Sequence, residues 1–141
     1  MSARNVERIV GVVVLGAITV VVGFALVGAA PTPEDWAAAV FFAGMGLLAT
    51  LLSYPVGRST SGSISFLPFL AVATVAPNVA AVVAVAASVI VAELAQRRAL
   101  IKAVFNVAQD VLGIGLAIVV LQALMLRDAG ADVTPRVTQV F

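Results

Sequence analysis

The sequence contains no cysteine and no histidine. Without these residues the chain cannot form disulfides, use a thiolate nucleophile, ligate a metal through sulfur or imidazole, or build a Ser-His-Asp triad. The zinc motif His-Glu-x-x-His is excluded for the same reason. No pair of carboxylates and no activated nucleophile emerges from the remaining residues. We therefore expect no catalytic residues, no metal site, no cofactor and no enzymatic activity.

Charged residues are also scarce. Only 11% of the 141 residues are charged, whereas 62% are hydrophobic, and the mean hydropathy is +1.17. A soluble domain carries about 25% charged residues, because its surface has to be wetted. This chain cannot cover itself with polar side chains, so we expect a lipid bilayer to surround most of it. Its eight cations form no dense patch, and we expect no nucleic-acid partner.

Long apolar runs make up most of the chain. Prolines, charges and interfacial aromatic residues divide these runs, and about 20 apolar residues in a helix cross a bilayer core of about 30 Å. The sequence predicts an all-α integral membrane protein with about five transmembrane helices in a single membrane domain, residues 1–141. The expected spans are residues 9–30, 37–54, 62–76, 79–96 and 103–126, followed by a short non-cytoplasmic tail, residues 127–141.

The third of these spans is ambiguous. It is short and interrupted by Pro68, so that as a helix it covers only about 20 Å and is either a kinked crossing or a re-entrant segment. A crossing places six of the eight cations on one side of the membrane, which the positive-inside rule favours. The six are Arg4, Arg8, Arg58, Arg97, Arg98 and Lys102; the other two are Arg127 and Arg136. We expect a multi-pass protein of the bacterial inner (plasma) membrane with a cytoplasmic N-terminus.

A polar stripe enters the last predicted span. At about 100° per residue, Lys102, Asn106, Gln109 and Asp110 share one helix face, and such a face has to meet protein rather than lipid. Asp110 is either a proton-responsive or ligand-binding group, or a member of a hydrogen bond between helices. Glu93, by contrast, is expected at a solvated helix end, paired with the cation at position 97 one turn later.

Small side chains recur every four residues in the fourth predicted span. The residues are Ala80, Ala84, Ser88 and Ala92. A ridge of small side chains allows membrane helices to pack at close range, so we predict a helix-packing face. The alternative is that an alanine-rich composition produces this spacing by chance.

Three blocks of the chain carry a resemblance to known proteins: Ser61–Val72, Ala92–Arg98 (Ala-Glu-Leu-Ala-Gln-Arg-Arg) and Lys102–Gln109 (Lys-Ala-Val-Phe-Asn-Val-Ala-Gln). Over roughly residues 58–118 the chain resembles the N-terminal multi-span membrane domain of bacterial signalling proteins that end in an HD-GYP phosphodiesterase, a diguanylate cyclase or a histidine kinase. The resemblance implies a sensor or anchor without catalytic activity. Five crossings leave the C-terminus outside, so an output domain of that kind would need a sixth span.

Two functions follow as expectations. The first is a non-catalytic, sensor- or anchor-like membrane module that acts through partner proteins. The second is a small accessory subunit packed against a larger membrane complex. Both predict other membrane subunits, or further copies of the chain, as partners within the bilayer. A pore or carrier is the weakest interpretation, because the intramembrane polar residues are few and lie near one face.

Overall fold

The computed structural model describes residues 3–52, 54–55, 61–62 and 64–131. In this part of the chain the structure is helical apart from two paired dipeptides and short connections. The helices are α1 (Ala3–Val27), α2 (Pro33–Leu51), α3 (Phe66–Val75), α4 (Val79–Ala95) and α5 (Leu100–Ala131). The dipeptides β1 (Tyr54–Pro55) and β2 (Ser61–Gly62) pair antiparallel. The prediction of an all-α protein is confirmed.

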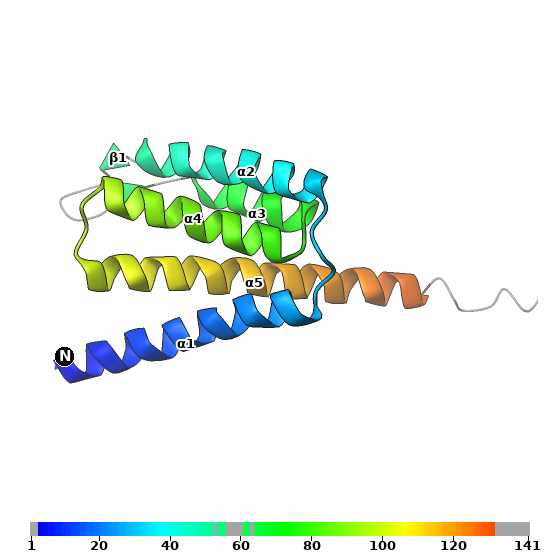
Figure 1. Cartoon of the computed structure of the whole chain (residues 1–141), viewed down its shortest axis with the longest axis horizontal. Coiled ribbons are helices and arrows are strands. Elements are labelled where there is room, and N and C mark those ends of the chain that lie inside the picture. The colour runs from blue at the N-terminus through cyan, green and yellow to red at the C-terminus, as the bar shows by residue number, and fades with distance from the viewer. Residues whose placement is uncertain (1–2, 53, 56–60, 63, 132–141) are drawn as a thin grey trace, which may run out of the picture.

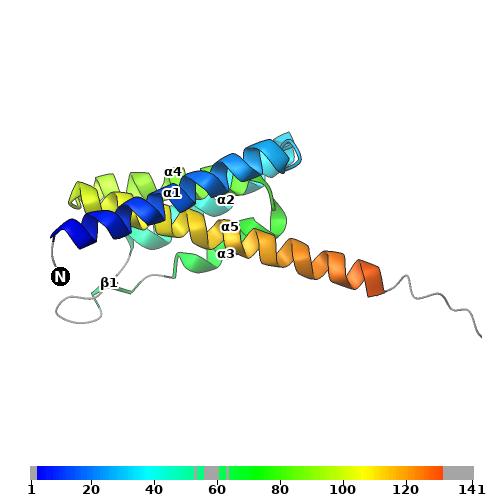
Figure 2. The same cartoon turned by 90° about the horizontal axis from the view of Figure 1, so that it is seen from below.

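The helices form layers. α3 and α4 lie between α2 and α5, and α1 lies on the opposite side of α5 (Figure 1). α4 is the most enclosed helix, with nine buried residues, because α2, α5, α1 and α3 all contact it. α1 packs mainly against α5. The C-terminal part of α5 extends past the other helices, as Figures 1 and 2 both show.

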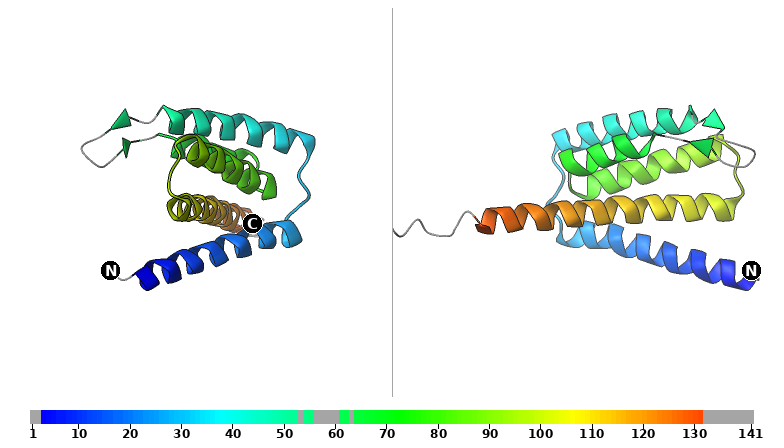
Figure 3. Two further views of the ribbon diagram at one scale, coloured as in Figure 1. Left: turned by 60° about the vertical axis from the view of Figure 1, so that its left-hand side comes forward. Right: turned by 180° about the vertical axis from the view of Figure 1, so that it is seen from behind.

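The connections between helices gather at two ends of the bundle. The start of α1, the β1–β2 pair and the turn between α4 and α5 lie at one end, and the α1–α2 and α3–α4 connections lie at the other (Figures 1 and 3). At this second end the side chain of Asn78 reaches the carboxylate of Asp35, and Gln122 Nε2 donates to the Pro77 carbonyl at 3.0 Å. The N-termini of α2 and α4 are therefore level with each other.

Three of the helices in the described residues are long and apolar enough to cross a membrane. They are α1 over Asn5–Val27, α2 over Pro33–Leu51 and α5 over Leu100–Arg127. α3 and α4 are shorter, with 10 and 17 residues. The membrane-protein prediction is supported by these three helices, but the structure does not confirm the count of five spans.

Several helix ends differ from the predicted spans. The first helix ends at Val27 rather than at residue 30, where a glycine and the approach to Pro31 disfavour helical backbone. The second begins at Pro33 rather than at residue 37, because Thr32 and Asp35 form a capping box: the Thr32 amide donates to Asp35 Oδ2 at 2.8 Å and the Asp35 amide donates to Thr32 Oγ1 at 3.2 Å. α5 continues to Ala131, into the predicted tail, whose residues 132–141 lie outside the described part.

Pro68 does not interrupt the third helix, which corrects the prediction. α3 begins at Phe66, so that Pro68 occupies its first turn. The backbone N–H that proline lacks would have no helical acceptor there, and its fixed φ suits the start of a helix. The proline therefore accounts for where α3 begins and leaves a short helix without a break.

The predicted ridge of small residues faces the interior. Ala80, Ala84, Ser88 and Ala92 are all buried. Ser88 Oγ donates to the Ala43 carbonyl of α2 at 3.0 Å, a buried hydrogen bond that requires the two helices to be close. Small side chains on α4 are what allow this distance, since a larger side chain would hold the backbones apart.

We expect Ala84→Leu to destabilise the protein by about 2 kcal/mol, because three more carbons have to enter a packed interface. The control is Ala87→Leu, on the same helix but exposed. Thermal unfolding in mild detergent should separate the two variants. Equal midpoints for both would show that the ridge does not pack as described.

Candidate functional site

The turn after α4 places one acidic side chain inside the bundle. The Arg98 amide donates to the Glu93 carbonyl at 3.3 Å and the Arg97 amide donates to the Leu94 carbonyl at 3.1 Å, which is the hydrogen-bond pattern of a Schellman motif. Arg97 adopts a φ of 50°, the left-handed conformation that this motif requires. The chain therefore reverses sharply after α4 and brings the start of α5 back beside the last turn of α4.

Glu93 is the charged residue that this turn encloses. Its side chain is only 7% exposed, and its Oε1 accepts a hydrogen bond from Asn106 Nδ2 of α5 at 2.9 Å. Arg98 Nη1 lies 3.4 Å from the same oxygen. The other oxygen, Oε2, is buried and accepts no hydrogen bond from the described residues. Desolvating a carboxylate is costly, so the hydrogen bond from Asn106 and the ion pair with Arg98 are needed to hold Glu93 in this position.

This arrangement corrects the prediction for Glu93. The sequence predicted a solvated helix end with an ion pair to Arg97. The structure buries Glu93 and pairs it with Arg98, because Arg97 has left the helical path and cannot stand one turn beyond Glu93. The signal that could have indicated burial is its spacing of four and eight residues from the buried Val89 and Val85.

The predicted polar stripe divides into two parts. Asn106 faces Glu93, and the half-buried Asp110, one turn further along α5, lies near Glu93. Lys102 and Gln109 are exposed. The acidic cluster thus consists of Glu93 from α4 and Asp110 from α5, with Asn106 as a hydrogen-bond donor to Glu93 and Arg98 as its ion-pair partner. No group of three or more potential metal ligands occurs among the described residues.

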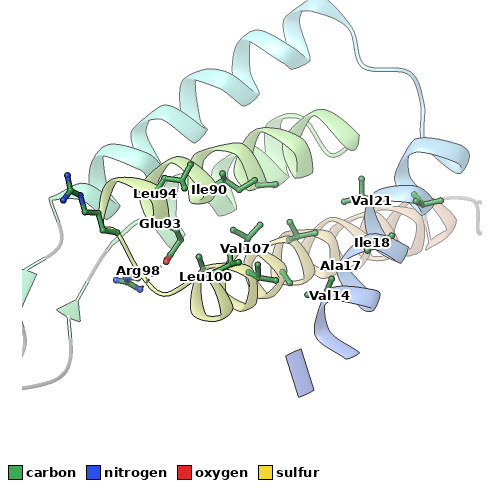
Figure 4. A pocket seen from close by; sticks show the side chains of 17 residues that line it. Val14, Ala17, Ile18, Val21, Ile90, Glu93, Leu94, Arg98, Leu100 and Val107 are labelled. Atoms are coloured by element: carbon green, nitrogen blue, oxygen red, sulfur yellow. Dashed lines mark ion pairs between the residues drawn. The ribbon is translucent and has the colours of Figure 1, made fainter. Parts of the chain in front are cut away.

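An apolar groove begins at this cluster. It has a volume of about 570 Å³ and lies between α1, α4 and α5. Its walls include Val14 and Ile18 of α1, Ile90 of α4 and Val107 of α5 (Figure 4). Among the described lining residues Glu93, Arg97 and Arg98 are the polar ones, and all three lie at the end next to the α4–α5 turn. The groove is therefore polar at the end next to the α4–α5 turn and apolar over the rest of its length.

A second, smaller hollow lies on the other side of Arg98. It has a volume of about 380 Å³ and is lined by α1 near its N-terminus and by the first turns of α5, including Lys102 and Asn106. Arg98 lines both hollows. Its guanidinium carries five N–H donors, and the ion pair with Glu93 leaves most of them available.

Comparison with known protein families, with curated proteins and with solved structures gives no match for this chain.

Proposed function

We propose that this chain is a non-catalytic membrane module of the sensor or anchor type, which acts through a partner protein. The observation that carries the proposal is the buried Glu93, held by Asn106 and Arg98 at the end of the apolar groove. Ionisable groups inside a membrane protein are expensive to keep, and they commonly mark a site where a ligand or a proton acts. The signalling-domain resemblance stated from the sequence points the same way.

The position of α1 suggests how such a site would communicate. α1 forms one wall of the groove, and it packs mainly against α5, whereas α4 is held on several sides. A change in the contents of the groove would therefore act on α1 more than on α4. We propose that the consequence is passed to a partner in the membrane, either another protein or a second copy of the chain.

The proposal includes five crossings of the bacterial inner membrane with a cytoplasmic N-terminus. Its support is that the described cations Arg8, Arg97, Arg98 and Lys102 belong to the end at which α1 begins, while Arg127 belongs to the opposite end. The N-termini of α2 and α4 lie at the same end of the bundle. This favours a chain that crosses the membrane once through α3 and once more through α4. A cationic end is expected on the cytoplasmic side.

Cysteine labelling tests this topology without background, since the chain has no cysteine. Asn5→Cys and Ala99→Cys should react only with reagents that reach the cytoplasm. Glu34→Cys and Arg127→Cys should react with impermeant reagents from outside. Asn78→Cys reports on α3 and α4: outside labelling indicates a crossing, whereas protection from both sides would contradict five crossings.

Purification in mild detergent tests the proposed function itself. A sensor or anchor should co-purify with a signalling protein or as a defined oligomer, and Glu93→Gln should alter the output of that partner while the complex persists. A monomer without any partner, in cells where the chain is expressed from its own locus, would contradict the proposal.

The accessory-subunit function remains a second candidate because of the overhang of α5. Leu124, Met125 and Leu126 are 51%, 62% and 75% exposed on the part of α5 that extends past the bundle (Figure 1). A larger complex could cover this segment. The same purification distinguishes the two functions, since a stoichiometric large assembly that tolerates Glu93→Gln favours the subunit.

A further inference from the structure

The length of the groove matches one leaflet of a bilayer. On α5 its lining runs from Leu100 to Val111, which at about 1.5 Å per residue is about 17 Å. Half of a hydrocarbon core of about 30 Å is about 15 Å. The polar residues stand at one end of this distance, so the groove has the layout of a single lipid leaflet, with a charged boundary and an apolar interior.

The shape of the groove favours a slender occupant over a helix. α1 diverges from α5 toward its N-terminus and approaches it toward its C-terminus (Figures 1 and 3). A partner helix is about 10–12 Å wide and continues through the whole membrane. A volume of about 570 Å³ lies within the range of about 300–1,000 Å³ that small-molecule sites occupy. An alkyl chain is narrower than a helix, ends within one leaflet and fits a groove of this volume.

The polar end specifies the chemistry of the head. Glu93 Oε2 is a buried acceptor without a donor in the part of the chain that the structure describes, and it belongs to a residue that lines the groove (Figure 4). Arg97 is exposed and has no ion-pair partner among the described residues, and Arg98 keeps unused donors. A ligand that fits therefore carries a hydroxyl for the carboxylate oxygen and, next to it, an anionic group for the two guanidinium groups.

We propose that the groove binds a single-chain anionic amphiphile with a hydroxyl beside its anionic group, the chemistry of a lysophospholipid. The alkyl chain lies along Ile18, Val104 and Val107, and the phosphate binds Arg97 and Arg98. The Glu93 side chain turns toward the groove, so that Oε2, which is buried in this structure, accepts the hydroxyl. This inference rests on the proposed function, because it names the ligand class of the site at which the sensor would receive its signal. Binding itself requires no partner protein.

Binding to the purified chain in dodecyl maltoside tests the inference. The probe is 1-palmitoyl lysophosphatidic acid, measured by native mass spectrometry and by the rise in the unfolding midpoint. 1-Palmitoyl lysophosphatidylcholine keeps the chain and the hydroxyl but is zwitterionic, and palmitate keeps the chain and an anion but has no hydroxyl. We expect one molecule of the first probe to bind, about tenfold more tightly than either of the others, which corresponds to about 1.4 kcal/mol.

Two pairs of variants locate the site. Val107→Trp fills the groove and should abolish binding, while Val120→Trp, exposed on the same helix, should leave it unchanged. If Val107→Trp fails to fold, Arg97→Gln should weaken the phosphate probe toward the level of the zwitterionic one, and Arg127→Gln should not. Equal binding of all three probes, or binding that neither Val107→Trp nor Arg97→Gln weakens, would overturn the inference.

These outcomes also separate the inference from the proposed function. If the probes fail to bind but a co-purifying partner responds to Glu93→Gln, the sensor function is supported and the lysophospholipid site is refuted. Selective binding by a chain that has no partner would support the ligand site and contradict the sensor.

Discussion

Gly46→Ala is expected to lower the unfolding midpoint of the purified protein, although alanine favours helices over glycine by about 1 kcal/mol. Gly46 lies in α2, and a Cβ added there would overlap the ring of Phe69 in α3. Phe69 is 5% exposed, so its ring has no free space into which to move. Overpacking of this kind costs about 1–3 kcal/mol. The measurement is thermal unfolding in detergent.

Gly44→Ala provides the matched control. It lies in the same helix, two residues earlier, and a Cβ added there meets nothing within 4 Å. This variant should be as stable as the wild type or slightly more stable, because only helix propensity changes. Phe69→Leu in the Gly46→Ala background should recover part of the loss by making room for the methyl group. Equal midpoints for the two alanine variants would refute the close contact between α2 and α3.

The two glycines illustrate what the sequence could and could not predict. Both stand in an apolar helix and both permit close approach, yet only Gly46 lies against a neighbouring ring. Which glycine is used depends on the rotation of α2 about its axis. In a helix that is apolar on every face, hydrophobic periodicity does not indicate that rotation. The helical class was predictable because composition alone requires it, while the packing partners were not.

The ends of the helices were only partly predictable from local signals. The capping box of Thr32 and Asp35 is visible in the sequence as Thr-Pro-Glu-Asp, but the apolar run that predicts the second span begins only at residue 37. The sequence predicts a connection between residues 96 and 103. Its sharp reversal was not predictable, because the left-handed residue after α4 is an arginine rather than glycine or asparagine. Because of this reversal Glu93 pairs with Arg98 and not with Arg97, the partner that the sequence predicts.

Of the acidic cluster, the sequence indicates the residues of α5 but not the burial of Glu93 on α4. The stripe on α5 was visible because polar residues are rare there, and Asn106 does face the interior of the bundle. The sequence predicts Glu93 at a solvated helix end because Arg97 follows it by four residues, a favourable pair near a membrane interface. Its burial depends on the sharp reversal of the chain and on contact with α5, which are tertiary features that local sequence does not specify.

Asp110 differs from Glu93 in what its neutralisation should do. Asp110→Asn keeps the shape of the side chain and removes its titratable group. We therefore expect Asp110→Asn to unfold at the same temperature as the wild type, in contrast to changes at Glu93. If Asp110 serves only to join helices, the output of any partner should also be unchanged.

Glu93→Leu is expected to destabilise the protein by about 1–3 kcal/mol, because the amide of Asn106 loses its acceptor within the bundle. Arg98 contributes less to this loss, since its side chain is 37% exposed and its guanidinium regains water.

Asn106→Leu should also destabilise the protein, because it removes a hydrogen-bond donor from the buried carboxylate of Glu93. The double variant Glu93→Leu with Asn106→Leu should lose less than the sum of the two single variants, since neither polar partner is then left alone. Unfolding midpoints of the four proteins complete the cycle. Strict additivity would mean that the two side chains do not interact, and would remove the hydrogen bond on which the site between α4 and α5 is built.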